Sequence, residues 1–387
     1  MVSYNALPVN FIIFFSNIHV KSLYLPNHFI TRKLPMTSKI IGVGNYIPSQ
    51  TITNLFFGQH EFMDESGKAL KQDNATIAGK LKEITGIEER RYANKTQVTS
   101  DLGFLAAQAA IENADINPET LDYIIFAHNF GDVHFGTVQS DTVPSIASRV
   151  KNLLKIKNNF CVAYDVLFGC PGWIEGMIQA HAFIKSGIAK RCLVIGAETL
   201  SRVVDIHDRD SMIYADGAGA AILELSDDES GIKSHISGSF TLKEKDYLYF
   251  GKSYNNDSNP DIKYIKMNGR KIYEFALSNV PSAMKKCLDE SGYSIHQLDK
   301  IIIHQANEKM DEAIVNRFYQ LYDVPVPENI MPMVIHKLGN SSVATIPSLL
   351  TMILNNELPQ HTIKEGNVVL FASVGAGMNV NAIVYRF

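Results

Sequence analysis

The chain repeats one pattern of helix and strand signals in its two halves, and this repeat limits the folds that it can adopt. Each half contains an amphipathic helix followed by an apolar strand. The first half has a helix over 101–113 and a strand over 121–129, and the second has a helix over 273–290 and a strand over 298–305. Each half closes with a Gly-Ala-Gly step that leads into a strand, at 217–219 and at 375–377. Strands that alternate with amphipathic helices predict a layered α/β fold, here with two pseudo-equivalent halves that face each other across a pseudo-two-fold axis.

Cys170 stands where an apolar, β-prone stretch over residues 160–166 passes directly into a helix. Pro171 suits a first helical turn, and apolar residues recur at helical spacing from Trp173 onward. Free N–H groups and the helix dipole lower the pKa of a thiol at such a junction, so we expect a thiolate nucleophile. The alternative is a small buried core thiol, the commoner fate of a cysteine in a reducing compartment.

Two polar residues occupy similar junctions further along the chain. His304 follows the apolar run 301–303, and Asn340 stands in a Gly-Asn-Ser-Ser stretch just before the helix predicted over 344–355. Each has a structural alternative, a satisfied histidine at a strand end and a turn or N-cap asparagine. Together with Cys170 they form a candidate set of nucleophile, base and orienting group.

Composition excludes several classes of function. The formal net charge is −4, which argues against nucleic acid or an anionic membrane as the main partner. The cysteines show no spacing typical of zinc or redox sites, and no metal or nucleotide-hydrolysis motif is present. These features predict free thiols in a reducing cytoplasm. The four cysteines are Cys161, Cys170, Cys192 and Cys287.

Residues 1–35 differ from the rest, and we interpret them as an extension outside the fold. The apolar run 11–15 is far shorter than the roughly 20 residues that span a bilayer, so membrane anchoring is the minor interpretation. The fold is expected to comprise an N-terminal half, 36–225, with the cysteine candidate, and a C-terminal half, 226–387, with the histidine and asparagine candidates.

The order of these motifs resembles the 3-oxoacyl-acyl-carrier-protein synthase III family of thiolase-fold condensing enzymes, over essentially Met36–Phe387. The resemblance implies a duplicated thiolase-like α/β fold with layers in the order αβαβα. The motifs that carry it, in chain order, are Cys170, Tyr214–Ala221, His304–Asn307, Gly339–Ser342 and Gly375–Gly377.

The resemblance also implies a decarboxylating condensation that needs no cofactor. An acyl group from acyl-CoA or an acyl carrier protein would be transferred to Cys170 and then joined to malonyl-acyl-carrier-protein, giving a 3-oxoacyl thioester for fatty acid, lipid or polyketide synthesis. His304 Nε2 and the Asn340 amide would donate to the enolate oxygen. The N–H groups of Cys170 and Ala376 would hold the oxyanion of the acyl-cysteine carbonyl.

Binding residues and assembly follow from the same resemblance. Arg209 matches an arginine that holds the nucleotide end of coenzyme A, but the family's second nucleotide clamp is missing from residues 79–87. Lys309 and Arg270 are candidates for docking the acidic acyl carrier protein. A homodimer is implied, in which Val143 closes the partner's acyl tunnel.

Other functions remain as alternatives. The long segments 129–141 and 56–73 favour a specialised enzyme that joins two acyl chains, as in dialkylresorcinol-forming relatives. A non-catalytic thiolase-fold partner subunit is a second alternative, although such subunits usually lose the cysteine or histidine. A papain-like protease lacks support around Cys170. A biosynthetic thiolase needs a second cysteine, which 374–377 does not contain.

Overall fold

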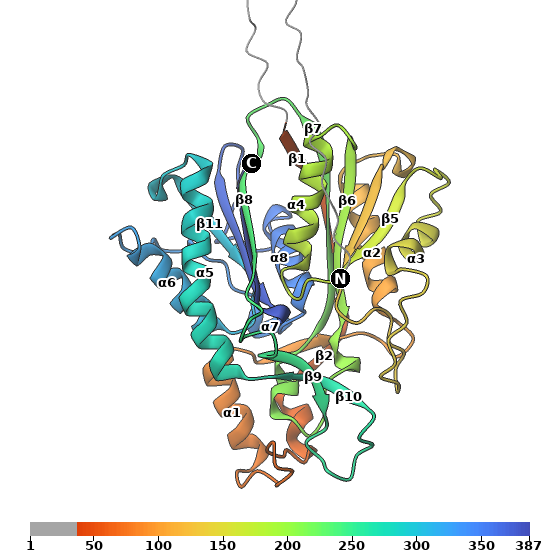
Figure 1. The fold of residues 1–387 in the computed structure, drawn as a ribbon, viewed down its shortest axis with the longest axis vertical. Helices are drawn as coiled ribbons and strands as arrows, with labels where there is room; N and C mark the ends of the chain where they lie inside the picture. Colours follow the sequence, from red (N-terminus) through yellow and green to blue (C-terminus); the bar gives the residue numbers. More distant parts are fainter. Residues whose placement is uncertain (1–36) are drawn as a thin grey trace, which may run out of the picture. The chain divides into compact units, whose positions relative to one another are not determined.

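Two mixed β-sheets form the centre of the protein (Figure 1). The computed structural model describes residues 37–387, and the extension predicted over 1–35 lies outside them. The first sheet has the order β1 (Thr37–Tyr46), β7 (Asp216–Ser226), β6 (Arg191–Thr199), β4 (Tyr123–Ala127) and β5 (Val162–Val166). The second has the order β8 (Gly231–Ser239), β13 (Asn379–Arg386), β12 (Val368–Gly375) and β11 (Leu298–Ile303).

The two sheets match strand for strand, as the repeat predicts. In both, the first three strands pair antiparallel and the third pairs with the fourth in parallel. The first sheet has a fifth strand, β5, beside β4. At the matching edge of the second sheet, no further strand of the described residues follows β11, and the Ile301 N–H donates to the Ile330 carbonyl at 2.9 Å. The division into halves at 225/226 remains our proposal, and the matching order supports it.

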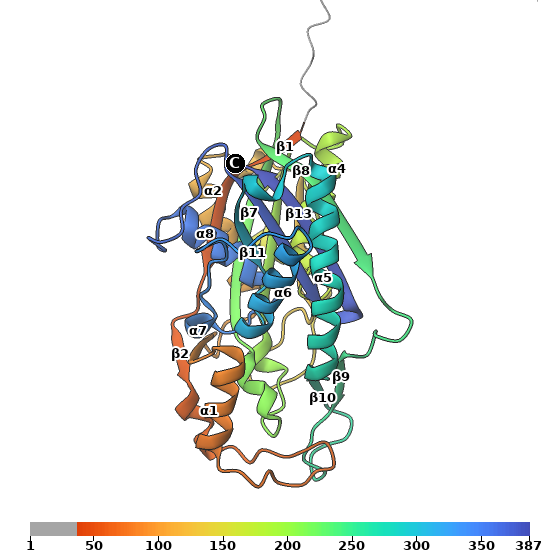
Figure 2. The same ribbon diagram turned by 90° about the vertical axis from the view of Figure 1, so that its left-hand side faces the viewer.

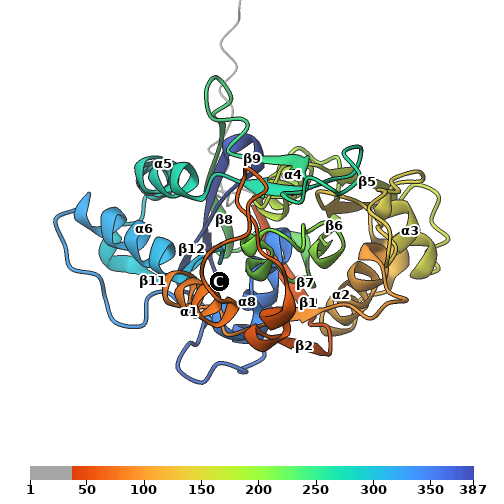
Figure 3. The same ribbon diagram turned by 90° about the horizontal axis from the view of Figure 1, so that it is seen from below.

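Helices fill three layers around the sheets. α4 (Gly172–Lys185) and α8 (Thr345–Leu354) lie between the two sheets (Figures 1 and 3). Most of their residues are buried, as expected for helices covered on both sides. α2 (Thr99–Asn113) and α3 (Ile146–Leu153) cover the outer face of the first sheet, and α5 (Gly269–Ser291) and α6 (Glu308–Gln320) cover that of the second. The layers therefore follow the predicted order αβαβα.

Several of the remaining elements gather at one end of the sheets. Figure 2 shows α1, β2 and the β9–β10 hairpin together there. α1, β9 and β10 contribute to the walls of the two cavities described below. The bounds of the remaining elements are β2 (Gln50–Thr53), α1 (Asn74–Thr85), β3 (Glu89–Tyr92), β9 (Leu248–Lys252), β10 (Lys263–Met267) and α7 (Ile335–Leu338). The short 3₁₀ helices are Asn54–Gln59, Pro118–Thr120, Leu200–Arg202, Arg209–Ile213, Ile295–Gln297, Ser342–Ala344 and Ala376–Met378.

The two Gly-Ala-Gly steps take different conformations. The first lies inside strand β7, whereas the second forms the turn between β12 and β13. Gly219 packs within β7 against α8, where an added Cβ would lie 2.7 Å from the Ser348 nitrogen. The first step is therefore needed for close packing and the second for a turn.

We predict that Gly44→Ala lowers the free energy of unfolding by about 1–3 kcal/mol, because an added Cβ would lie 2.4 Å from the Ala106 carbonyl oxygen and from the Ala110 nitrogen of α2. Urea unfolding followed by circular dichroism measures this change. Gly58→Ala is the matched control, since nothing lies within 4 Å of its added Cβ. Equal effects of the two substitutions would show that the contact between β1 and α2 is not tight.

Candidate active site

A cavity of about 270 Å³ brings the predicted site residues together. Cys170 precedes α4, His304 follows β11, Asn340 follows α7, and Ala376 follows β12; all four line the cavity. The lining is otherwise largely apolar. The nucleophile candidate of the first half thus faces the polar candidates of the second, as the sequence predicts.

Two glycines allow the backbones of the two halves to meet beside Cys170. Gly169 has a φ of 67°, and a Cβ there would lie 2.6 Å from the Ala376 nitrogen. A Cβ on Gly375 would lie 2.5 Å from the Cys170 nitrogen. Such distances exclude any side chain at either position, so both glycines are required for the contact.

Two asparagines of β13 hold the loop that carries the cysteine. Asn379 Nδ2 donates to the Phe168 carbonyl at 3.2 Å, and Asn381 Nδ2 donates to the Pro171 carbonyl at 3.0 Å. Because side chains alternate along a strand, both lie on the face directed at this loop. Sequence reasoning missed them, although two alternate amides in an otherwise apolar strand are a usable signal.

The orientation of the Asn340 amide is set by its neighbours. The Asn340 backbone bridges to the first half, donating to the Ile213 carbonyl at 3.0 Å and accepting from the Ala215 N–H at 2.9 Å. Its Oδ1 accepts the Ser342 N–H at 2.8 Å. With the oxygen engaged, Nδ2 is the group available to the cavity, which suits a donor to a developing oxyanion.

His304 is held as a neutral ring. Burial lowers its pKa to about 4. Its Nδ1 lies 2.7 Å from Thr345 Oγ1, which also lies 3.0 Å from the Ser342 carbonyl oxygen. The single hydroxyl proton of Thr345 can be donated to either acceptor, and donation to Nδ1 leaves the ring proton on Nε2. This geometry is compatible with the expectation that Nε2 donates, which stays a prediction.

The thiol acidity also differs from the sequence-based expectation. Burial raises the pKa of Cys170 to about 11; a hydrogen bond from Ser342 Oγ to Sγ, 3.2 Å long, opposes this shift, and Glu198 makes a smaller contribution in the raising direction. The prediction that the helix N-terminus would produce a net lowering is therefore wrong, because the cost of desolvating the thiolate is larger. The other three cysteines are buried away from this cavity.

A larger outer cavity of about 970 Å³ adjoins the first. Arg209 and Arg270 line it, and both side chains are largely exposed. Lys309 is exposed on α6 but lies outside the lining of both cavities. Val143 also lies outside both linings and is 86% exposed. The two cavities share Met267, Ile272, Ala306, Met310 and Asn340.

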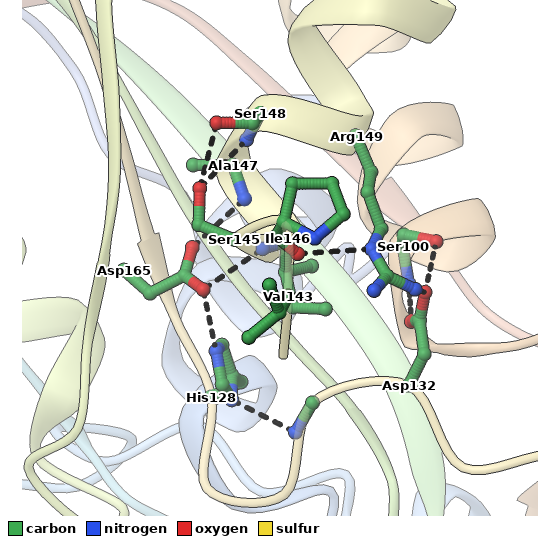
Figure 4. A network of polar contacts seen from close by, with 12 residues as sticks. Ser100, His128, Asp132, Val143, Ser145, Ile146, Ala147, Ser148, Arg149 and Asp165 are labelled. Atoms are coloured by element: carbon green, nitrogen blue, oxygen red, sulfur yellow. Dashed lines mark hydrogen bonds and ion pairs between the residues drawn. The ribbon is translucent and has the colours of Figure 1, made fainter. Parts of the chain in front are cut away.

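Polar contacts hold the loop that follows β4 (Figure 4). His128 Nδ1 accepts the Gly131 N–H at 2.9 Å, and its Nε2 bonds Asp165 Oδ2 at 3.1 Å. Arg149 pairs with Asp132 at 2.8 Å near the start of the loop and with Asp141 at 2.6 Å near its end. The loop that begins with Asn129 and ends at Val143 is thereby anchored at both ends to the first sheet and α3.

Within 37–387, no group of three or more His, Cys, Asp or Glu side chains could hold a metal ion. In the same range no helix combines the length and apolar character needed to cross a bilayer.

Comparisons with known proteins agree with the geometry. Residues 164–239 match the family model described as 3-oxoacyl-[acyl-carrier-protein (ACP)] synthase III, and residues 288–387 match its C-terminal model. The chain is 32% identical over 353 residues to beta-ketoacyl-[acyl-carrier-protein] synthase III of Listeria monocytogenes, covering 91% of this chain and 99% of that protein. The Staphylococcus haemolyticus protein of the same name is 30% identical over 353 residues.

Solved structures share the fold. The 3-oxoacyl-[acyl-carrier-protein] synthase III of Aquifex aeolicus superposes with a TM-score of 0.74 at 29% identity, covering 90% of this chain and 100% of that one. The priming beta-ketosynthase of the R1128 polyketide pathway has a TM-score of 0.75 at 23% identity, covering 90% of this chain and 96% of that one, a likeness of fold.

We predict that iodoacetamide labels Cys170 before the three buried cysteines, and that the rate keeps rising between pH 7 and pH 9. A thiol with its pKa raised to about 11 gains thiolate throughout this interval. Peptide mass spectrometry after timed alkylation measures both points, with Cys170→Ala as the control. A rate that levels off below pH 8 would mean that the helix N-terminus outweighs burial.

Proposed function

Because the chain belongs to the beta-ketoacyl-[acyl-carrier-protein] synthase III family, it is an acyltransferase that condenses thioesters, and we propose that Cys170 is its nucleophile. The reaction joins an acyl thioester to malonyl-acyl-carrier-protein, releases carbon dioxide and forms a 3-oxoacyl thioester. The observation that carries the assignment of the nucleophile is the shared cavity of Cys170, His304 and Asn340. Four free cysteines accord with the cytoplasm, where we place the enzyme.

In the first half-reaction, Cys170 Sγ attacks the thioester carbonyl of the primer. A bond forms between Sγ and the acyl carbon, the bond to the carrier sulfur breaks, and the thiol proton ends on the departing carrier thiol. The N–H groups of Cys170 and Ala376 would hold the oxyanion, and the approach of the two backbones supports this pairing.

In the second half-reaction, the malonyl carboxylate leaves as carbon dioxide and negative charge develops on the thioester oxygen. Asn340 Nδ2 is the donor that we assign to this oxygen. His304 Nε2 is the second donor that we assign to it, in the tautomer whose Nδ1 accepts from the Thr345 hydroxyl. The enolate carbon then attacks the acyl-Cys170 carbonyl and frees the thiolate.

The two adjoining cavities suggest how the substrates enter. The apolar inner cavity suits an acyl chain, and the stacked rings of Phe130 and Phe250, 5.0 Å apart, form part of its wall. We place the carrier arm in the outer cavity, with Arg209 and Arg270 near its phosphate. Exposed Lys309 suits contact with an acidic acyl carrier protein.

We predict that Cys170 carries the acyl adduct after incubation with acyl thioesters of different chain lengths. Asn340→Ala and His304→Ala should slow malonyl decarboxylation by about 10²–10³ and acylation by less, because a donor to the enolate oxygen acts only in the second half-reaction. Intact-protein mass spectrometry measures acylation, and carbon dioxide release measures decarboxylation.

Cys170→Ala is the control that must abolish adduct formation. An adduct on Cys161, Cys192 or Cys287 would disprove the proposed nucleophile. Equal losses in both half-reactions would disprove the roles given to His304 and Asn340.

We also propose a homodimer, and the exposed edge of the first sheet supports it. β5 has no neighbour on its outer side among the described strands. Apolar side chains are exposed on and around it, which a second copy would cover. These are Val143, Phe160, Val162 and Leu167.

Val143→Phe is expected to shift primer preference toward shorter chains without dissociating the dimer. Val143 is exposed within its own chain, so its effect on an acyl pocket must act on the partner. Competition between primers of different length measures preference, and light scattering measures mass. A fully active monomer would contradict the proposed assembly.

A further inference from the structure

A chain of hydrogen bonds runs from a buried carboxyl to the sulfur of Cys170. Asn129 Nδ2 donates to Glu198 Oε1 and also to Ser342 Oγ, the latter at 3.1 Å. Ser342 Oγ in turn donates to Cys170 Sγ at 3.2 Å. The four residues come from the ends of β4 and β6, the segment after α7 and the start of α4, so only the fold brings them together.

The direction of donation along this chain follows from the chemistry of each group. Glu198 Oε1 accepts a hydrogen bond from Asn129 Nδ2. This bond orients the Asn129 amide so that the NH₂ group faces both Glu198 and Ser342. An amide NH₂ can only donate. Ser342 Oγ therefore accepts from Asn129, and its single proton is left for the sulfur.

The surroundings hold these groups in place. Glu198 is completely buried, and its Oε2 has no partner among residues 37–387, which leaves Oε1 as its bonded atom. Ser342 is buried and has a φ of 52°, a backbone conformation that non-glycine residues adopt mainly where function or packing requires it. The segment that carries Asn129 is anchored by His128 (Figure 4).

We propose that Asn129 and Glu198 are positioning residues that direct the Ser342 hydroxyl proton onto the Cys170 sulfur and so favour its ionisation. This inference rests on the proposed role of Cys170 as nucleophile. The hydroxyl stabilises the thiolate at the moment when acyl transfer begins, and Asn129 prevents it from turning away. Glu198 acts only through the orientation of Asn129.

A simple electrostatic role of Glu198 makes the opposite prediction. Burial raises the pKa of Glu198 to about 8, so most of this carboxyl is ionised at pH 8.5, and its charge raises the pKa of Cys170. Replacing Glu198 by an uncharged residue would then make the thiol more reactive. If Glu198 instead orients Asn129, its replacement makes the thiol less reactive. The sign of the change therefore separates the two roles.

The test is the rate of alkylation of Cys170 by iodoacetamide at pH 8.5 in the full-length protein, followed by mass spectrometry. Ser342→Ala should lower this rate about three- to tenfold, since it removes the donor to the sulfur. Asn129→Asp keeps the volume but offers an acceptor that draws the hydroxyl away, and it should lower the rate as much. Glu198→Leu should also lower it.

Double variants show whether the effect passes through the hydroxyl. In the Ser342→Ala background, Asn129→Asp and Glu198→Leu should each change the alkylation rate by less than about twofold. The hydroxyl through which both residues act is then already absent, so the effects of the substitutions do not add. Ser342→Gly removes the hydroxyl together with the positive-φ strain and must slow alkylation as Ser342→Ala does. Asn113→Asp is the matched control, since Asn113 Oδ1 accepts from the Val43 N–H far from the thiol and Asp keeps that acceptor.

The proposal is overturned if Ser342→Ala leaves the rate unchanged, if Glu198→Leu raises it, or if Asn129→Asp has the same effect in both backgrounds. Alkylation needs no acyl substrate, so the outcome is independent of whether an acyl adduct forms on Cys170. An unmodified Cys170 after acyl-thioester incubation would contradict the proposed function and leave this measurement intact.

Discussion

Ser342 is the residue through which the parts of the site are held in one arrangement. Its N–H donates to Asn340 Oδ1, its carbonyl accepts from Thr345, the partner of His304, and its hydroxyl donates to Cys170 Sγ. All of its polar groups are thus used, each toward a different catalytic candidate. The positive φ of 52° lets one buried residue aim these groups in three directions, which explains why the strain is retained.

Burial disfavours charge on the catalytic candidates of the resting site. Burial keeps the His304 ring neutral by lowering its pKa to about 4 and raises the pKa of Cys170 to about 11. In such surroundings a hydrogen-bond donor stabilises a developing anion more than it does in water. Charge then appears only during the reaction, first on the sulfur and oxyanion and later on the enolate oxygen, where the donors of Ser342 and Asn340 are already oriented.

Much of this arrangement could be predicted from the chain. The repeat of strand and helix signals led to the duplicated layers, and the predicted helix over 101–113 and strand over 298–305 agree closely with α2 and β11. Cys170, His304 and Asn340 were found because each stands where one element passes into the next. β4 and β5 are shorter than predicted. The strand signal in the sequence extends beyond the residues that make the hydrogen bonds of the sheet.

The sequence by itself determined the layered α/β fold, its internal repeat and the identity of the candidate nucleophile and its partners, because these depend on local periodicity and on residue types at element ends. Only the tertiary structure decided the hydrogen-bond partners of these groups and the acidity of His304 and Cys170. Those properties depend on burial and on groups distant in the chain, such as Asn129, Glu198 and Ser342, which come within bonding distance only when the two sheets pack around α4 and α8.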